Sequence, residues 1–598
     1  MVPGRELYII EREYFGEKIE CVYGQELKPL QLAEFEALPE EEKKTARPYP
    51  FNQRTYEAAP GITCHQDVAV PMRDGVELYA DIFLPANPGE KIPAILAWSN
   101  YGKRCNEFRP PELVGFTPGV PVGAISEMAK FEAPDPSYWC RHNYAVINVD
   151  IRGIGYSGGY HDQFGIQDAQ DGYDFIEWVA AQDWCNGRVT MSGSSALAIS
   201  QYHIAAQQPP HLACIAPWEG MSDMYRESLY EGGIPCIAFT DFATAGAAGL
   251  NGIDDQGGMA RKYPLMNGYW KNKIPPFEKI VCPMYVTAGW NHFHLRGSMN
   301  AWRLAGSKDK WLRAHREFEW PDFYTPENIE DLRRFFDRYC KDIHNGWEMT
   351  PRVRLGVMDV FDQDYAVNRP EREFPLARTH YERLYLNAAD GTMQPEPVAA
   401  EASVSYDATE GLVAFDYKFA EDTELTGYPY LRVWAEAQGH DDMDLIITVK
   451  KLSTAGIEQP ITIFGGTAPH PGAWGKMRVS HRELDPELST PYNPVQAHTR
   501  ELKLAPGEIA PCDIEITPLS RFWHAGETLR VTIAGRYIRD PHWIEPLMLE
   551  CDNKGTHVIH AGGKYDSFLQ IPVAPPKYGP DTVFEVNVDQ HPTSPIFV

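Results

Sequence analysis

Between residues 61 and 218, short apolar runs alternate with helical stretches, which is typical of a parallel β-sheet covered by helices. The runs Ile92–Trp98 and Tyr144–Val149 are apolar at nearly every position, as strands buried on both faces are. Helical patterns begin at Asp168 and cover Ala196–Gln207. The other strand candidates in this part of the chain are Val76–Leu84, Gly187–Ser192, His211–Ala216 and Ile280–Ala288.

Changes in composition and in the strand and helix pattern divide the chain into several segments. Residues 1–60, rich in charge and proline, are expected to form an N-terminal extension. Residues 61–218 and 282–349 are predicted to form one α/β domain. Residues 219–281 interrupt it with methionine- and aromatic-rich sequence, which we interpret as a helical cap over one end of the sheet. From residue 350 to 598, short alternating segments and frequent turns predict a separate antiparallel β domain of the jelly-roll type.

The composition excludes several kinds of partner. Lys and Arg total 55 against 83 Asp and Glu in 598 residues, a formal charge of −28. Such a field repels polyanions, so we expect neither nucleic acid nor an anionic membrane as a partner. No segment approaches the roughly 20 apolar residues that span a bilayer. A cytoplasmic protein is therefore the simplest expectation, with a homodimer left open.

The cysteines and short motifs also argue against a metal or cofactor. The 11 cysteines include no C-x-x-C pair, which argues against a disulfide framework or a structural zinc site and favours a reducing compartment. His292 and His294 have the spacing of two metal ligands, but no third ligand is evident. No zinc-protease helix, phosphate-binding loop or dinucleotide fingerprint is present. We therefore predict no cofactor.

The strongest local signal for chemistry lies within Val189–Ala198. A predicted strand there passes through Gly193-Ser194-Ser195 directly into a helix, which is the context that a nucleophile elbow needs. The tight turn demands small neighbours, and Gly193 and Ala198 meet that demand. Ser195 is the predicted nucleophile, placed at a helix amino terminus that favours developing negative charge. Ser194 is the alternative, but it comes one residue too early.

A serine nucleophile needs a general base, which in this sheet topology follows the last strand downstream of the serine. The segment Lys310–His315 fits, because a short strand ends in histidine before a predicted helix over 329–339. His315 is therefore the predicted base. His292 and His294 follow an earlier strand and are less well placed.

At this point the chain resembles the cocaine-esterase and Xaa-Pro dipeptidyl-peptidase group of α/β-hydrolases, which includes α-amino-acid ester hydrolases and glutaryl acylases. The similarity covers about residues 61–598, and many motifs occur in the family's order. The resemblance implies an α/β-hydrolase sheet with a helical cap insertion and a C-terminal jelly roll. The matching segments are Met72–Gly75, Leu78–Asp81, Tyr101–Lys103, Asp150–Gly158, Asp171–Trp178, Trp184–Val189, Asp442–Asp444, Ser480–Asp485 and Ala525–Arg530.

The resemblance also implies roles for individual residues. Ser195 would be the acyl-forming nucleophile and His315 the general base. Tyr101 lies where the family has a tyrosine whose hydroxyl donates to the oxyanion, and the backbone N–H of Ala196 would be the second donor. The family usually has tyrosine or tryptophan after the serine. With Ala196 at this position, the acyl pocket would lack that aromatic side chain.

The expected acid of the triad is missing from its usual place. The family has an aspartate in a Gly-Trp-x-Asp setting, whereas Gly289–His294 contains no carboxylate, and Asn291 or His292 occupies that position. A carboxylate can instead come from the end of the preceding core strand. Glu219 is our first candidate for the acid, with Asp223 and Asn291 as alternatives.

Together these features predict a serine hydrolase that cleaves an ester, or less readily an amide, through an acyl-enzyme. The Met- and aromatic-rich cap favours a small, largely apolar or aromatic acyl group. Three alternatives stay open: an Xaa-Pro-type dipeptidyl peptidase, an acyltransferase, and a catalytically impaired binding protein of the same fold.

Overall fold

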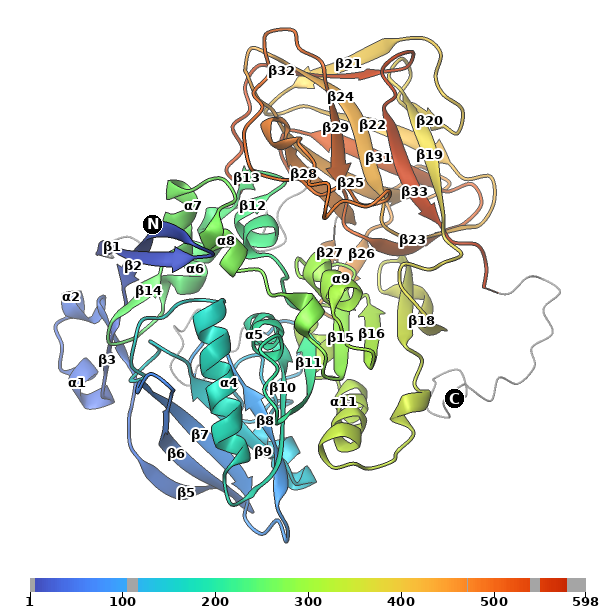
Figure 1. Ribbon diagram of the computed structural model, residues 1–598. Coiled ribbons are helices and arrows are strands. Elements are labelled where there is room, and N and C mark those ends of the chain that lie inside the picture. Colours follow the sequence, from blue (N-terminus) through green and yellow to red (C-terminus); the bar gives the residue numbers. More distant parts are fainter. Residues whose placement is uncertain (1–5, 105–116, 471, 538–548, 578–598) are drawn as a thin grey trace.

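The computed structural model describes residues 6–104, 117–470, 472–537 and 549–577. These residues form an α/β body with a strand-rich domain against one end of it (Figure 1). The predicted N-terminal extension (1–60) and the predicted C-terminal domain (350–598) include residues 1–5 and 578–598, which lie outside the described part of the chain. Cys105 also lies outside it.

The central sheet of the body is mostly parallel, as the sequence predicts. Its strands from β9 to β17 all run in one direction, whereas β5, β6, β7 and β18 pair antiparallel with their neighbours. In spatial order the strands are β5 (Arg54–Ala59), β6 (Ile62–Pro71), β7 (Glu77–Pro85), β9 (Ala145–Asp150), β8 (Ile92–Ala97), β10 (Cys185–Ser194), β11 (Leu212–Trp218), β15 (Met284–Gly289), β16 (Lys310–His315), β17 (Val353–Val360) and β18 (Gln363–Glu371).

Helices cover both faces of this sheet, which explains why its central strands are apolar throughout. In β8, Ala94 and Leu96 join a core shared with one set of helices, whereas the intervening Ile95 joins the core on the opposite face. The first face is covered by α4 (Ile166–Ala180), α5 (Ala196–Ala205) and α9 (Leu295–Leu304); the second is covered by α3 (Pro136–Trp139) and α11 (Pro326–Cys340).

The segment 219–281 contains short helices and also short strands. A third core joins its aromatic residues, among them Tyr225 and Trp270, to Ile19 and Tyr23 of the N-terminal residues. The N-terminal segment is thus a pair of strands built into the cap (Figure 1). The elements are η2 (Tyr225–Leu229), β12 (Tyr230–Glu231), β13 (Ile234–Pro235), α6 (Ile237–Ala245), β14 (Gly252–Asp254), α7 (Gln256–Lys262) and α8 (Gly268–Asn272), with β1 (Leu7–Tyr14) and β2 (Glu17–Gln25) pairing to β14.

The strand-rich domain consists of two antiparallel layers around one apolar core. One layer has the order β22-β31-β25-β28. The other is centred on β24, which pairs with β29 on one side and with β32 and β33 on the other. The strands are β19 (His380–Asn387), β20 (Thr392–Gln394), β21 (Ala402–Asp407), β22 (Leu412–Lys418), β23 (Thr423–Gly427), β24 (Tyr430–Gln438), β25 (Asp444–Leu452), β28 (Ala473–Arg478), β29 (Ala510–Glu515), β30 (Leu519–Trp523), β31 (Thr528–Ala534), β32 (Thr556–Ala561) and β33 (Phe568–Val573).

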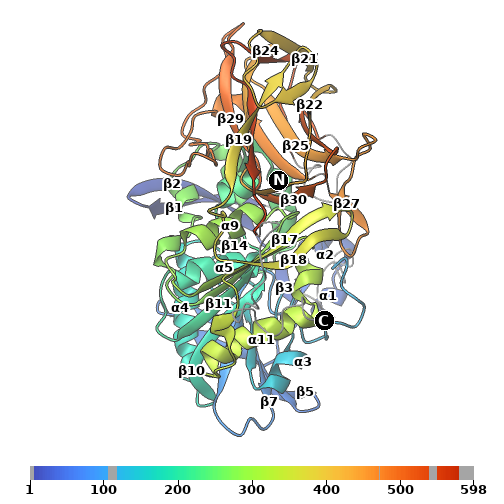
Figure 2. The same ribbon diagram turned by 90° about the vertical axis from the view of Figure 1, so that its right-hand side faces the viewer.

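The central sheet continues past residue 349, the predicted end of the α/β domain. Strand β17 pairs in parallel with β16, and it also meets β30 of the strand-rich domain through Met358 and Arg521. Figure 2 shows β17 and β18 at this junction. Strand β17 therefore belongs to the central sheet of the body and also connects the strand-rich domain to it.

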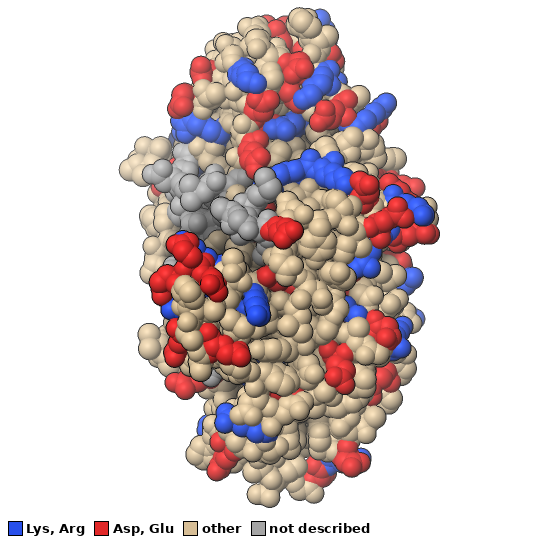
Figure 3. Space-filling view, turned by 90° about the vertical axis from the view of Figure 1, so that its left-hand side faces the viewer, with Lys and Arg blue, Asp and Glu red and all other residues tan. Residues whose placement is uncertain are grey.

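The ten described cysteines are all free thiols. On the face shown in Figure 3, acidic and basic side chains are interspersed and no continuous basic area is seen. None of the helices in the described residues combines the length and apolarity needed to cross a bilayer.

The contact between α4 and α5 gives a prediction about stability. A Cβ at Gly172 would collide with the side chain of Ile204, so Gly172→Val should lower the free energy of unfolding by about 1–3 kcal/mol through overpacking. Chemical denaturation measures this loss. Gln170→Val, which introduces the same residue at a half-buried position of the same helix, is the control; equal midpoints for the two variants would contradict the packing described here.

Candidate active site

Ser195 lies at the sharp turn between β10 and α5, with φ 54° and ψ −116°. Its N–H donates to the main-chain oxygen of Glu219 at 2.8 Å. A Cβ on Gly193 would come within 2.7 Å of the main-chain oxygen of Glu132, and a Cβ on Gly220 would come within 2.8 Å of the Cβ atom of Ala198. Small residues therefore permit the turn, which leaves the Ser195 side chain half-buried at the edge of the sheet.

The imidazole that contacts Ser195 is that of His294. Its Nε2 atom lies 3.0 Å from Ser195 Oγ. His294 is the residue that precedes α9 and follows β15 by five positions, so its side chain reaches back over the edge of the sheet. His294 is fully buried, and this burial lowers its pKa to about 3. A neutral imidazole next to a serine hydroxyl can accept its proton.

The expectation that His315 would meet Ser195 therefore has to be corrected in favour of His294. His315 is the last residue of β16 and pairs with Gly289 of β15, so the strand fixes the direction of its side chain. Its Nε2 atom lies 3.1 Å from Glu219 and 3.2 Å from Asp322. The pair His315–Glu219 proposed from the sequence is thus in contact, but on the far side of Glu219 from the serine turn.

Glu219 follows β11 and is fully buried with a positive φ of 60°. Its second carboxyl oxygen lies 3.4 Å from Nδ1 of His292. A Cβ at Gly289 would lie 2.7 Å from this carboxyl, so the glycine makes room for it. Burial raises the pKa of Glu219 above that of an ordinary glutamate, although His315 acts in the opposite direction.

The alternative candidates have other partners. Asp223 accepts hydrogen bonds from the main-chain N–H groups of Tyr225 and Arg226 and pairs with the Arg226 guanidinium at 2.6 Å. Asn291 donates to the main-chain oxygen of Arg316 at 3.1 Å. Ser194 is fully buried.

Two donors are available near the Ser195 hydroxyl. The hydroxyl of Tyr101 donates to Ser195 Oγ at 3.4 Å. Burial, with a further contribution from Glu132, raises the pKa of Tyr101 well above its ordinary value, so the phenol keeps its proton. Ala196 is the first residue of α5, where the initial N–H groups have no intrahelical acceptor. Both positions proposed from the sequence therefore flank the serine.

The surroundings of Ser195 are apolar. Five residues from the body and the cap form one cluster, against which Tyr101 and Phe293 pack. Their side chains offer no competing nucleophile and favour an apolar group next to the hydroxyl. The five residues are Phe164, Ala196, Ile199, Met221 and Met224.

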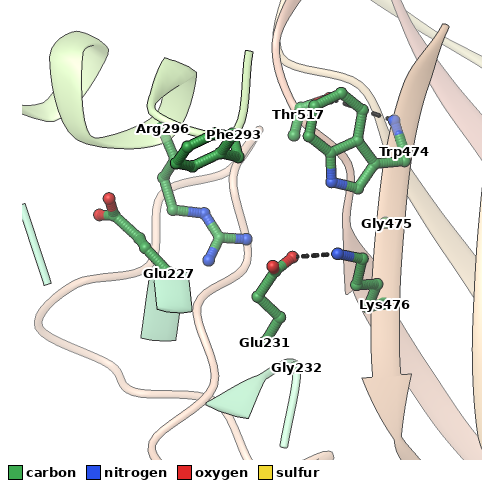
Figure 4. A pocket seen from close by; sticks show the side chains of 9 residues that line it. All are labelled: Glu227, Glu231, Gly232, Phe293, Arg296, Trp474, Gly475, Lys476 and Thr517. Atoms are coloured by element: carbon green, nitrogen blue, oxygen red, sulfur yellow. Dashed lines mark hydrogen bonds and ion pairs between the residues drawn. The ribbon is translucent and has the colours of Figure 1, made fainter. Parts of the chain in front are cut away.

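A polar pocket lies where the cap, α9 and β28 meet, and Phe293, the chain neighbour of His294, is one of its lining residues (Figure 4). Burial raises the pKa of Glu227 in this pocket to about 8. Glu231 pairs with Lys476 at 2.6 Å, and Arg296 extends toward the glutamates while pairing with Glu515 at 3.0 Å. The lining residues are Glu227, Glu231, Gly232, Phe293, Arg296, Trp474, Gly475, Lys476 and Thr517.

Potential metal ligands approach one another at a different place, where β17 meets the strand-rich domain. Asp359, His524 and Glu527 offer ligand atoms within 4.8 Å of one another. The ammonium group of Lys451 contacts Asp359 and lies 2.8 Å from Glu527. This lysine already supplies the positive charge that the two carboxylates need.

Two residues of the site were not singled out by the sequence analysis. Glu319 is fully buried, and its Oε1 lies 3.5 Å from Nε2 of His292. Glu132 accepts a hydrogen bond from Trp320 Nε1 at 2.7 Å and, through its main-chain oxygen, one from Ser194 N–H. Glu319 comes four residues after a predicted strand, which is a signal that could have drawn attention to it.

The strand order, the strained serine turn and the adjoining imidazole define an α/β-hydrolase. Comparisons with known proteins agree. Residues 74–262 match the X-Pro dipeptidyl-peptidase (S15) family, and residues 345–570 match the X-Pro dipeptidyl-peptidase C-terminal non-catalytic domain. The predicted fold class is confirmed.

Three individual proteins that resemble this chain are hydrolases or esterases by name. A CocE/NonD family hydrolase from Staphylococcus aureus is 35% identical, covers 86% of this chain and 94% of its own, and superposes with a TM-score of 0.80. Cocaine esterase from Rhodococcus sp. (strain MB1 Bresler) is 25% identical over 60% of this chain and 68% of its own length. An α-amino acid ester hydrolase structure shares the fold, with 14% identity, a TM-score of 0.62, and coverage of 90% of this chain and 99% of its own.

The chain belongs to the CocE/NonD family of hydrolases. The family resemblance inferred from the sequence is thereby confirmed.

Proposed function

We propose that the protein is a serine-dependent carboxylic ester hydrolase that cleaves small, largely apolar or aromatic acyl esters through an acyl-enzyme. The observation that carries this proposal is the 3.0 Å contact between Ser195 Oγ and His294 Nε2 at a strained strand-to-helix turn. In the first step His294 takes the serine proton while Oγ attacks the carbonyl carbon. The protonated imidazole then gives that proton to the leaving alcohol, and a water molecule releases the acyl group by the same route.

The developing oxyanion needs donors that do not have to reorganise. The Tyr101 hydroxyl, 3.4 Å from Ser195 Oγ, and the Ala196 N–H at the start of α5 are suited to this role. Removal of one such donor typically costs ~10²–10³ in kcat. The apolar cluster that includes Ile199, Met221 and Met224 supports an apolar acyl group, because methionine side chains adapt to irregular shapes.

The first test concerns the nucleophile and the base. Ser195→Ala should abolish covalent labelling by a fluorophosphonate, and His294→Ala should lower kcat on a p-nitrophenyl ester by ~10⁴-fold or more. Intact-protein mass and steady-state kinetics measure the two effects. His211→Ala, which removes an exposed imidazole paired with Glu177, is the control. Labelling of Ser195→Ala at the wild-type rate would refute the assignment, and so would an unlabelled wild-type protein, as expected for an impaired binding protein.

The second test uses the buried state of His294. Because burial lowers the pKa of His294 to about 3 from an ordinary value of 6.5, the imidazole stays neutral as the pH falls through 6.5. The acid limb of kcat/KM should therefore lie well below pH 6.5. Kinetics on a p-nitrophenyl ester, restricted to pH values at which circular dichroism shows the native fold, give this profile. An inflection at pH 6.5 or above would contradict the proposal.

A second candidate function is an Xaa-Pro-type dipeptidyl peptidase. Such an enzyme needs a carboxylate that holds a free amino terminus, and the pocket lined by Phe293 contains the acidic residues Glu227 and Glu231. A panel of p-nitrophenyl esters and Xaa-Pro anilides separates the two. We expect kcat/KM to be higher on the esters by at least ~10²-fold; the reverse order would make the peptidase the better assignment. Added alcohols or amines in the ester assay reveal acyl transfer, as partitioning of the product.

A further inference from the structure

The base of the proposed catalytic pair lacks the usual support at its far ring nitrogen. His294 Nδ1 is buried and has no hydrogen-bond partner among the described residues. In a Ser-His-acid triad a carboxylate at this atom fixes the ring and its tautomer. The ring of His294 must therefore be held in another way.

A hydrogen bond of the His294 main chain provides this support. Its N–H donates to Nδ1 of His292 at 3.1 Å. The His292 ring is fully buried and lies against Phe318 and Phe293, with ring centroids 4.1 and 4.3 Å apart. A packed ring with no access to water provides a rigid acceptor for this N–H group.

This hydrogen bond fixes the tautomer of His292. A nitrogen that accepts a hydrogen bond carries its lone pair, so the ring proton of the neutral imidazole is on Nε2. Burial, reinforced by the neighbouring histidines, lowers the pKa of His292 well below the ordinary value, which keeps the ring neutral. His292 Nε2 lies 3.5 Å from Glu319 Oε1, without a hydrogen bond between the two atoms.

The Glu219 carboxyl lies beside this ring without a hydrogen bond to it. Glu219 Oε2 is 3.4 Å from His292 Nδ1, and Glu219 Oε1 is 3.1 Å from His315 Nε2. The one lone pair of His292 Nδ1 already accepts from the His294 N–H, so it has no room for a second donor. Burial raises the pKa of Glu219 above that of an ordinary glutamate, which favours its neutral form.

The negative charge on this side of the site belongs to Asp322. Although burial alone would raise its pKa, the Arg313 guanidinium holds the pKa of Asp322 below the ordinary value. Arg313 contacts both carboxyl oxygens of Asp322, and Trp218 Nε1 donates to the same group at 2.9 Å. Asp322 therefore has its cationic partner in Arg313, and this ion pair does not involve Glu219.

Glu219 also holds the nucleophile. Its main-chain oxygen accepts the Ser195 N–H at 2.8 Å. The main-chain N–H group of each member of the catalytic pair thus donates to a buried neighbour: Ser195 to the main-chain oxygen of Glu219, and His294 to the side chain of His292.

We propose that His292 is a positioning residue, which accepts the main-chain N–H of His294, sets the 3.0 Å contact between His294 and Ser195, and thereby replaces a carboxylate on the far nitrogen of the base. The inference rests on the proposed function, because it concerns the geometry of the proposed nucleophile and base. The reaction itself transfers no proton through His292 or Glu219.

The first pair of variants tests the acceptor on His292. His292→Leu removes the acceptor for His294 N–H and should lower kcat on a p-nitrophenyl ester by about 100-fold, since displacement of a catalytic group by about 1 Å has this cost. KM should change by less than about threefold. The amide oxygen of Asn can occupy the place of the imidazole Nδ1, so His292→Asn should recover kcat to within about tenfold of wild type. His211→Leu, a change at an exposed histidine, is the control.

A change at Glu219 tests whether this carboxyl supplies the support in place of His292. Glu219→Gln removes any carboxylate charge but keeps the main-chain oxygen that accepts the Ser195 N–H, so kcat should fall by no more than about tenfold. A loss of about 100-fold would show that the carboxylate charge is required and would overturn the proposal.

The outcomes also separate this inference from the proposed function. Denaturation midpoints identify any variant that fails to fold; should His292→Leu be one of these, His292→Asn and Glu219→Gln still decide, since a 100-fold loss in either refutes the proposal. If the fluorophosphonate labels Ser195 but His292→Leu turns over at the wild-type rate, only the positioning role fails. If wild-type protein is not labelled at Ser195, the proposed function fails and this inference with it.

Discussion

The strained turn at Ser195 is the constraint on which the rest of the site depends. A non-glycine residue with φ 54° and ψ −116° persists only where its surroundings hold it. Here the hold comes from the Ser195 N–H bond to Glu219, from the close approach of Gly193 to Glu132, and from the α5 helix that starts at the next residue. The same turn directs the hydroxyl away from the sheet and brings the first free N–H group of the helix beside it.

Four acidic residues are buried behind this turn and the residues that contact it. Glu132, Glu219, Glu319 and Asp322 are all nearly or fully buried. Of these, Asp322 has an arginine partner in Arg313, whereas burial and neighbouring carboxyls raise the pKa of Glu319 well above its ordinary value. A buried carboxyl without a cationic partner is stable when it is neutral and hydrogen-bonded. Such neutral groups can shape an active site without adding charge to it.

The sequence was sufficient for those features that depend on local patterns. Apolar runs such as Ile92–Trp98 predicted the core strands, and the Gly193-Ser194-Ser195 turn predicted the elbow. The placement of Glu219 at the end of β11 also predicted its contact with His315 at the end of β16, because the carboxyl ends of parallel strands lie at one edge of the sheet. These inferences needed only periodicity and strand order.

The sequence was not sufficient where distant segments meet. The pairing of β2 with β14 joins residues more than two hundred positions apart, and no local pattern specifies it. The choice between His294 and His315 depended on side-chain direction: His315 is held by the strand β16, whereas His294 lies beyond the end of β15 and turns back toward Ser195. Motif order favoured the wrong histidine because the rule describes chain order and not where each imidazole points.

A crystal structure of the phosphonate adduct tests the central claim most directly. The account predicts phosphorus bonded to Ser195 Oγ, His294 Nε2 within hydrogen-bond distance of the adduct, and the phosphoryl oxygen facing the Tyr101 hydroxyl and the Ala196 N–H. An adduct on another residue, or one in which His315 contacts Ser195 in place of His294, would contradict it.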